Sequence, residues 1–340
     1  MKQIRTEDAV GHVLCHDITQ IVKDVKKGVA FKKGHVVTKE DIPVLLSIGK
    51  EHLYIWEKDD NMLHENEAAE ILYGICHNEN IAPSEVKEGK IEAIAQCDGV
   101  FKVDVERLMD INSIDRVMIA TRHNNFPVKK GDTLAGTRVI PLLIEKETME
   151  EVKKAAGDKP LLSLVPYIHK KVGIVTTGSE VYKGRIKDAF GPVIRQKLEP
   201  FGVEILGQEI VDDKQEMITA AIEGFLAKGA DMIVCTGGMS VDPDDVTPSA
   251  IKETGAEIIS YGAPVLPGAM FLLSYKGDIP IMGLPGCVMY AGATVFDLVL
   301  PRVMTGEKLS KRDLVKLGHG GLCTGCKPCH YPHCHFGKGE

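Results

Sequence analysis

The sequence lacks several features that would place it outside the class of water-soluble globular proteins. No apolar run approaches the length that spans a bilayer, and the amino-terminal residues MKQIRTEDAVGHVL lack the apolar centre of a signal peptide. There is no excess of positive charge either. The formal net charge of −7 excludes a general attraction to nucleic acid or anionic lipid. We therefore expect a cytoplasmic protein without a membrane or nucleic-acid partner.

What is present is a chain of 340 residues, long enough for two or three domains. Its hydrophobic content of 44% and charged content of 26% are ordinary for a globular protein. Nine cysteines in a reducing compartment are not expected to pair as disulfides, so clustered ones are interpreted first as metal ligands. Five cysteines are scattered and are expected to be small buried apolar groups, with Cys287 in a predicted cleft: Cys15, Cys76, Cys97, Cys235 and Cys287.

Residues 1–160 are expected to form a mixed α/β and β-rich region. A short helix is expected from Asp41 to Gly49, and a second over Glu65–Asn78. Short strands are expected around them, at Val36-Val37, His52–Trp56, Ile91–Ala95, Val100–Val103 and Thr133–Leu143. The charged stretch Glu145–Lys159 predicts a linker or an exposed helix.

Residues 161–310 alternate between strands and helices. The expected strands are Val172–Val175, Glu204–Val211, Met232–Cys235, Glu257–Ser260 and Ile279–Met282. The expected helices are Asp188–Phe201, Lys214–Lys228, Pro248–Glu253 and Val288–Leu300, with Thr247 as the cap of the third. Such alternation predicts a three-layer α/β fold around a doubly wound, mostly parallel sheet.

Three of the predicted strands end in turns of small residues. The first lies in Lys171–Asp188 (KVGIVTTGSEVYKGRIKD), the second in Cys235–Pro248 (CTGGMSVDPDDVTP), and the third is Gly283-Leu284-Pro285-Gly286. In a parallel α/β sheet, ligands bind at the carboxyl ends of the strands, where backbone N–H groups can face anions. The neighbouring carboxylates suit a hard cation. Together they indicate a phosphate-bearing ligand with Mg²⁺.

These motifs, in their order, resemble those of the molybdopterin-binding domain of molybdenum-cofactor biosynthesis proteins. The motifs are TTGSEVYKGRIKD, IVDDKQEMITAAI, CTGGMSVDPDDVTPSAI, PVLPG and LPG. The upstream segments GHVL, KGHVV with EDI, and GDTLAGT are similar to the amino-terminal domains of the MoeA-type molybdopterin molybdotransferases. The Asp-Gly-Tyr-Ala segment usual in those enzymes is missing near Val22–Ala30.

The resemblance implies a molybdopterin ligand and Mg²⁺-dependent nucleotide chemistry. In the MoeA-type reaction adenylated molybdopterin is hydrolysed and molybdate enters the dithiolene, so molybdopterin, nucleotide and molybdate would be the ligands. It also implies a homodimer in which the amino-terminal domain of one subunit covers the cleft of the other. Anions of this kind need neutralisation by metal and backbone amides.

Matching motif to motif assigns residues to the cleft. The cofactor-binding set would be Thr177, Gly178, Ser179, Asp213, Gly237, Gly238, Ser240, Pro285 and Gly286. The catalytic set would be Glu180, Asp188 and Asp245, with Glu180 and Asp188 orienting water or ligand. Asp245 would hold Mg²⁺, with Asp242 and Asp244 as competitors, since three acids in four positions favour a cation.

Several of these assignments have a plainer alternative. An acidic pair such as Asp212-Asp213 before a helix is often a cap rather than a ligand contact. Lys183 and Arg185 could clamp an anion, but surface cations are common. The loop Arg122–Asn125 is better interpreted as an exposed turn than as a substrate contact across domains.

The chain also departs from the family pattern at three places. Ala189-Phe190 follows Asp188 where the family continues Asp-x-Asn, and Cys287-Val288 follows Leu-Pro-Gly where the family has Asn-Pro. Ala269 stands where longer members have the lysine of Pro-Gly-Lys-Pro. Each departure removes a pterin or phosphate contact. A non-catalytic carrier that delivers the cofactor to a molybdenum enzyme, and an adenylyltransferase acting on molybdopterin, are therefore alternative functions.

Residues 311–340 form a third segment, a tail rich in glycine, cysteine and histidine that is not expected to bury a core without help. Its cysteines follow the spacing C-x2-C-x2-C-x4-C, which suits an iron–sulfur cluster and also a four-thiolate Zn²⁺ site. The alternative is an unstructured tail with idle thiols. The predicted ligands are Cys323, Cys326, Cys329 and Cys334.

Overall fold

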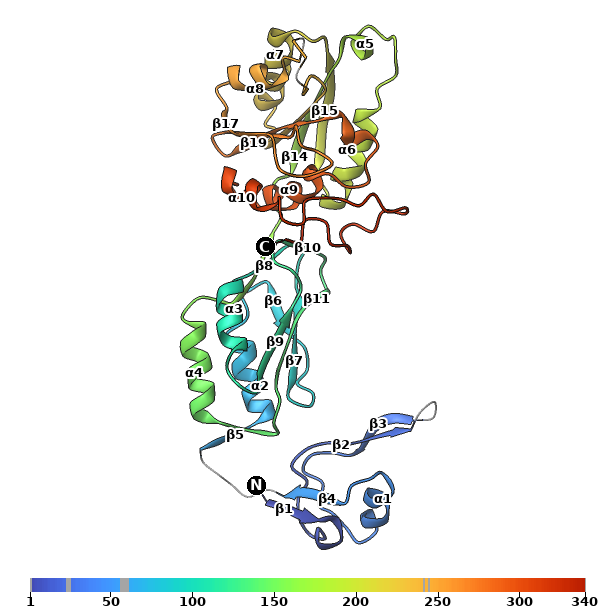
Figure 1. Ribbon diagram of the computed structural model, residues 1–340, viewed down its shortest axis with the longest axis vertical. Helices are drawn as coiled ribbons and strands as arrows, with labels where there is room; N and C mark the ends of the chain where they lie inside the picture. Colours follow the sequence, from blue (N-terminus) through green and yellow to red (C-terminus); the bar gives the residue numbers. More distant parts are fainter. Residues whose placement is uncertain (1, 23–25, 56–60, 241, 244, 340) are drawn as a thin grey trace. The chain divides into compact units, whose positions relative to one another are not determined.

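The computed structural model describes residues 2–22, 26–55, 61–240, 242–243 and 245–339 (Figure 1). The chain divides into two compact units. Unit 1 comprises Met1–Cys97 and Phe101–Leu164, and unit 2 comprises Asp98–Val100 and Val165–Glu340. Across these described ranges, no helix combines the length and the apolar character that a membrane crossing requires.

The first part of unit 1 is built from short strands and one helix. Lys2–Arg5 (β1) pairs antiparallel with His52–Ile55 (β4), and Ile18–Val22 (β2) forms a hairpin with Lys26–Phe31 (β3). The predicted helix is present as Asp41–Ser47 (α1). The expected strand at Val36-Val37 is only a single bridge between Val36 and Val13, and Trp56 lies outside the described residues.

The second part of unit 1 is an antiparallel sheet with helices packed against it (Figure 1). Its strand order is β6-β7-β11-β9. The strands are Ile81–Pro83 (β6), Lys90–Ala95 (β7), Thr133–Val139 (β11) and Val117–Thr121 (β9). A smaller sheet has the strand order β10-β8-β13, formed by Phe126–Val128 (β10), Gly99–Val103 (β8) and Leu162–Pro166 (β13). A further two-stranded sheet pairs Leu143–Glu145 (β12) with Met62–His64 (β5).

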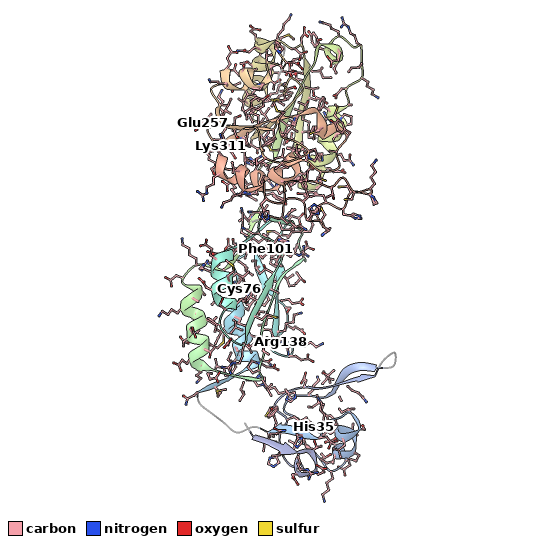
Figure 2. The ribbon with its side chains drawn as sticks, in the orientation of Figure 1. His35, Cys76, Phe101, Arg138, Glu257 and Lys311 are labelled. Carbon is pink, nitrogen blue, oxygen red and sulfur yellow. The ribbon has the colours of Figure 1, made fainter. Side chains whose placement is uncertain are left out.

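Three helices accompany this sheet: Glu65–Gly74 (α2), Val105–Asn112 (α3) and Lys146–Ala156 (α4). Helix α3 was not predicted, although Asp104 caps it by accepting a hydrogen bond from the Arg107 amide at 3.1 Å. The charged stretch predicted as a linker or exposed helix is α4, and one of its faces is fully buried through Met149, Val152 and Ala156. Its charges cover only the outer face. Figure 2 labels Cys76 and Phe101, both fully buried in the same core.

Unit 2 is organised around a six-stranded sheet of order β15-β14-β16-β19-β18-β17. The strands are Glu204–Val211 (β15), Lys171–Thr177 (β14), Met232–Thr236 (β16), Ile279–Leu284 (β19), Leu272–Lys276 (β18) and Glu257–Tyr261 (β17). The first four strands are mutually parallel, and β18 is antiparallel to both of its neighbours. The predicted mostly parallel α/β sheet is confirmed.

Helices cover both faces of this sheet and make three layers (Figure 1). Phe190–Leu198 (α6) and Val295–Met304 (α9) bury apolar side chains against one face, together with Val172 and Val234. Gln215–Ala227 (α7) and Thr247–Glu253 (α8) do the same on the other face, with Val175 and Ile233. Strands buried on both sides explain the continuous apolar runs in the sequence.

The last helix of the sheet begins later than its apolar pattern predicts. Helix α9 starts at Val295 instead of Val288, because Thr294 and Asp297 form a capping box. The preceding residues form a short 3-10 turn, Gly286–Met289, and Ala291 lies outside the helix. The third ligand turn is therefore followed by a loop rather than directly by a helix.

The tail packs onto unit 2. After Lys311–Lys316 (α10), the described residues contain no further helix or strand, yet Phe336 is only 1% exposed and lies in the core beneath α9. The Tyr331 hydroxyl donates to the Asp297 carbonyl at 2.7 Å, and the Cys323 amide donates to Leu266 O at 2.8 Å. Beyond α10, the tail thus contributes one buried side chain to the core of unit 2 and, among the described residues, forms no separate core of its own. Helix α10 packs beside β17, and Figure 2 labels their first residues, Lys311 and Glu257.

Candidate functional site

The register of the parallel strands brings the three predicted turns to one edge of the sheet. Thr176 is paired with Thr236, and Thr236 with Leu284. On the other side of β14, Thr177 is paired with Val211, so Asp212 and Asp213 leave the sheet at this same edge. These loops follow the carboxyl ends of four neighbouring parallel strands, where α/β folds bind ligands.

The second turn is pressed against the end of the first strand. Gly237 and Gly238 have φ angles of 86° and 56°, in the left-handed region that glycine tolerates. A Cβ atom on Gly237 would lie 2.2 Å from the Thr177 carbonyl oxygen, and one on Gly238 would lie 2.6 Å from Thr247 Oγ1. Both positions therefore require glycine, and the first and second turns are in direct contact.

Side chains from three directions hold the second turn. Thr247 Oγ1 donates to the Gly237 carbonyl at 2.9 Å, and the Ser240 amide donates to Asp245 Oδ2 at 2.8 Å. The Tyr261 hydroxyl lies 3.0 Å from Met239 O and 3.2 Å from Ser240 O. Tyr261 was not predicted from the sequence. Its only signal was its position at the end of a strand.

Two backbone amides of the second turn have no hydrogen-bond partner among the described residues. Within the part of the chain that the structure describes, the N–H groups of Gly238 and Met239 make no hydrogen bond. Consecutive backbone amides in a turn of this kind, here following the left-handed Gly237 and Gly238, form a concavity that attracts anions. This turn is therefore the element of the edge best suited to an anion.

The first turn has an acidic side chain on one of its amides. Gly178, with φ 144°, precedes the short helix Ser179–Tyr182 (α5), and the Ser179 amide donates to Asp213 Oδ2 at 2.7 Å. Asp212 is buried and its Oδ2 lies 3.9 Å from Lys214 Nζ. Of the acidic pair, Asp213 is the one that contacts the first turn. Glu180 lies on α5, its carboxylate near Gly178.

Asp188 has a different setting from the other predicted acids. Its carboxylate accepts hydrogen bonds from the amides of Phe190 at 2.9 Å and Gly191 at 3.1 Å, at the start of α6. Gln208 Nε2 donates to the same carboxylate at 2.7 Å and to Thr176 Oγ1 at 2.9 Å. Asp188 thus accepts hydrogen bonds from amides at the start of α6 and is linked through Gln208 to Thr176 of β14.

The third turn offers space. Pro285 and Gly286 follow β19, and a Cβ on Gly286 would meet no atom within 4 Å. By contrast, a Cβ on Gly283 would lie 2.6 Å from the Met239 sulfur, so the second and third turns also pack together. Burial raises the pKa of the Cys287 thiol, which is the opposite of what a reactive thiolate needs.

Asp245 is the described acid that lies against the second turn and could hold a metal ion there. Asp245 uses one carboxylate oxygen on Ser240, which leaves the other for a cation, and Asp242 lies three positions earlier. Asp244 lies outside the described residues. A carboxylate oxygen beside an anion-binding turn is a donor that Mg²⁺ accepts. Over the described ranges, no three His, Cys, Asp or Glu side chains gather into a metal-binding group.

All four tail cysteines are among the described residues, and no three of them lie close enough together to bind one metal ion. A Cβ on Gly292 would lie 2.9 Å from Cys329 Sγ, so Cys329 packs on the loop after the third turn. Cys323 and Cys334 are partly buried beside the core, while Cys326 and Cys329 are exposed. The metal site there remains a prediction.

The remaining polar candidates are a loop of unit 1 and two cations that follow α5. In unit 1, Arg122 pairs with Asp132 at 3.1 Å and Asn124 accepts from the Val103 amide at 3.1 Å. That loop is stabilised by its own neighbours. Lys183 and Arg185 are exposed after α5.

Comparison with known proteins identifies the domain that carries this edge. Residues 173–305, less than half of the chain, match the family described as "Probable molybdopterin binding domain". Residues 3–57 match a domain of unknown function, DUF8806. The α/β domain therefore has the molybdopterin-binding fold expected from its motifs.

Individual relatives match only parts of the chain or match it weakly. A CinA-like protein of Mycobacterium sp. (strain MCS) is 38% identical over 90 residues, which are 26% of this chain and 21% of the relative. The chain thus spans about a fifth of the length of that curated relative.

Two solved structures are similar at low identity. The molybdopterin biosynthesis enzyme MoaB of Thermus thermophilus is 23% identical, covering 41% of this chain and 98% of that one, with a TM-score of 0.33. The molybdopterin biosynthesis MoeA protein of Pyrococcus horikosii is 17% identical, covering 74% and 80%, with a TM-score of 0.33. At this level neither likeness bears on function.

Proposed function

We propose that unit 2 binds molybdopterin through its phosphate, with Mg²⁺, at the carboxyl edge of the sheet, and acts in molybdenum-cofactor biosynthesis. The observation that carries the proposal is the Gly237–Ser240 turn, where two amides without a partner among the described residues lie near the carboxylate of Asp245. Amides that need no reorganisation stabilise an anion better than water does. The family match of residues 173–305 supports the pterin as the ligand.

The reaction we propose is the molybdotransferase step, in which adenylated molybdopterin is hydrolysed and molybdate is inserted. Asp245 and Asp242 would hold Mg²⁺, which neutralises charge on the phosphates when bound. The amides of Gly238 and Met239 would hold phosphate, Glu180 would orient the attacking water, and Pro285 and Gly286 would border the ligand. We place this activity in the cytoplasm and in a homodimer.

A specific observation favours a second function, that of a non-catalytic carrier delivering the cofactor to a molybdenum enzyme. Asp188, one of the three predicted catalytic acids, accepts hydrogen bonds from two helix amides and from Gln208, and the asparagine expected after it is absent. A site with one fewer acid free for catalysis would bind the cofactor without converting it.

One experiment separates these functions. The purified protein is incubated anaerobically with molybdopterin or adenylated molybdopterin, ATP, Mg²⁺ and molybdate. Release of AMP with uptake of molybdenum supports the molybdotransferase. Tight binding of molybdopterin without turnover supports the carrier, and release of pyrophosphate indicates an adenylyltransferase. Absence of any affinity for molybdopterin rejects the proposal.

We also propose that the four tail cysteines bind a metal, as an iron–sulfur cluster or as Zn²⁺. The support is the spacing of Cys323, Cys326, Cys329 and Cys334 within twelve residues of each other. Binding would draw the thiolates together from their present separate positions. Metal analysis and an absorption spectrum of anaerobically purified protein test this, and absence of both iron and zinc would reject it.

A further inference from the structure

The second turn has two consecutive left-handed glycines, which bring no side chain to pack, and Met239, whose side chain is buried in the core. Besides that packing, its conformation depends on bonds made to its backbone by other elements. Tyr261, the last residue of β17, makes two of these through one hydroxyl group. We propose that Tyr261 is a positioning residue, which orients the amides of this turn toward the phosphate of the ligand. This inference rests on the proposed function.

The peptide unit that joins Met239 to Ser240 is held on both sides. This unit is planar, and its carbonyl and N–H groups point in opposite directions. The carbonyl accepts a hydrogen bond from Tyr261 at 3.0 Å, and the N–H donates to Asp245 at 2.8 Å. Because both ends are bonded, rotating the plane of this unit would break two hydrogen bonds.

A second fixed unit lies two residues earlier. The Gly237 carbonyl accepts from Thr247 at 2.9 Å, so the N–H on the opposite side of this unit, that of Gly238, points away from Thr247. The two fixed units flank the unit that joins Gly238 to Met239. Thr247 thus orients the amide of Gly238. Tyr261 and Asp245 restrict the Met239–Ser240 unit, which directly follows the amide of Met239 in the chain.

The state of the Tyr261 hydroxyl suits this role. Burial, together with the negative charge of Asp245, raises its pKa above the ordinary value near 10, so it keeps its proton at neutral pH. A protonated hydroxyl has one hydrogen to donate, and it is shared between Met239 O and Ser240 O. The side chain is 44% exposed, so removing its oxygen leaves no buried cavity.

The experiment compares Tyr261→Phe with wild type and with Tyr54→Phe in the full-length protein. Tyr54 is a matched control because it is 46% exposed and its hydroxyl has no partner within the described residues. Binding of molybdopterin and of enzymatically dephosphorylated molybdopterin is measured anaerobically by calorimetry, with Mg²⁺ present. Thermal unfolding of each variant is recorded alongside.

We expect Tyr261→Phe to bind molybdopterin at least tenfold more weakly, with its affinity for the dephosphorylated form and its unfolding temperature unchanged. Tyr54→Phe is expected to match wild type. Equal affinity of Tyr261→Phe and wild type for molybdopterin would overturn the inference while leaving the proposed function intact. Equal weakening toward both ligands would overturn it too, because that result indicates a general structural role. If wild type binds neither ligand, the proposed function fails and this inference fails with it.

Discussion

The carboxylate of Asp213 lies 2.7 Å from the backbone nitrogen of Ser179, so an acidic side chain occupies an amide of the first ligand turn. An incoming phosphate would compete with this carboxylate and be repelled by it. The second turn repeats the arrangement, with Asp245 on the Ser240 amide. In both turns a cation that binds the carboxylate would reduce this repulsion.

We therefore expect Asp213→Ala to bind molybdopterin about tenfold more tightly than wild type when Mg²⁺ is chelated. A factor of ten corresponds to ~1.4 kcal/mol, well within the repulsion between two charges a few ångströms apart near a protein surface. Asp278→Ala is the control, because Asp278 is exposed in the turn before β19, at the opposite edge of the sheet. Unchanged or weaker metal-free binding by Asp213→Ala would contradict the expectation.

When Mg²⁺ is present, removing the carboxylate of Asp245 is expected to weaken binding of molybdopterin rather than strengthen it. Asp245→Ala should lose the Mg²⁺-dependent part of molybdopterin binding and of AMP release, with the fold intact. Titrations at increasing Mg²⁺, followed by calorimetry and by nucleotide release, measure this. A variant whose turnover and Mg²⁺ dependence equal those of wild type would remove Asp245 from the site.

Gly237→Ala is expected to destabilise unit 2 by about 3 kcal/mol or more. The new methyl group would lie 2.2 Å from the Thr177 carbonyl, and alanine is strained at φ 86°. Gly286→Ala, where the methyl group has open space, should lie within about 0.5 kcal/mol of wild type. Urea unfolding measures both, and equal stabilities of the two variants would show that the second turn is not packed as described.

The stability of unit 1 should fall as the pH drops below about 6.5, and His64 should account for part of the fall. Its Nδ1 accepts from the Asn66 amide at 3.2 Å and faces Lys33 Nζ at 3.1 Å, so protonation of Nδ1 removes the one lone pair that both donors face. Burial lowers the pKa of His64; the Cys15 carbonyl opposes the shift and Lys33 adds to it. Because the folded-state pKa lies below the unfolded value, this stabilisation is complete above pH 6.5 and is lost as the pH falls through the folded pKa.

His64→Gln removes the titrating group, so its free energy of unfolding should depend less on pH between 7 and 5 than that of wild type. Chemical unfolding monitored at several pH values provides the measurement. Parallel pH profiles for the two proteins would be inconsistent with this role.

Phe336 tests whether the tail belongs to the core. Phe336→Ala should destabilise unit 2 by about 3–5 kcal/mol, the usual cost of truncating a buried phenylalanine. Val315→Ala on α10, where the valine is 56% exposed, should have little effect. If Phe336→Ala unfolds at the wild-type temperature, the tail does not contribute to the core and only a metal could hold it.

Much of the α/β domain was predictable because strands buried on both faces leave continuous apolar runs between amphipathic helices. The parallel order then brings the strand ends, and with them Thr177, Thr236 and Leu284, to one edge without further information. Strand β18 was missed, although Gly277-Asp278 between two apolar runs is a hairpin signal. Because β18 is antiparallel to both neighbouring strands and follows β17 without a helix between them, it interrupts the strand–helix alternation from which the sheet was predicted.

The contacts of individual side chains at the site were less predictable. Asp188 resembles a cleft acid in the sequence, but the helix directly after it takes up its carboxylate, and that signal for a cap was present. Tyr261 reaches the second turn from a strand at the far side of the sheet order, so no local pattern could indicate it. Helix α9 begins directly after its capping residue Thr294, and not at the earlier position that its pattern of apolar residues predicts.

The two threonines that end β14 face different sides of the sheet and join different networks. Thr176 bonds with Gln208 and Thr236, while the Thr177 hydroxyl lies 3.5 Å from that of Thr247. Inserting one residue into this strand would exchange their sides and disconnect both sets of bonds at once. Insertions should therefore be tolerated only ahead of the amino-terminal ends of these strands, whereas the carboxyl ends must keep both their residue number and the hydroxyl groups that make these bonds.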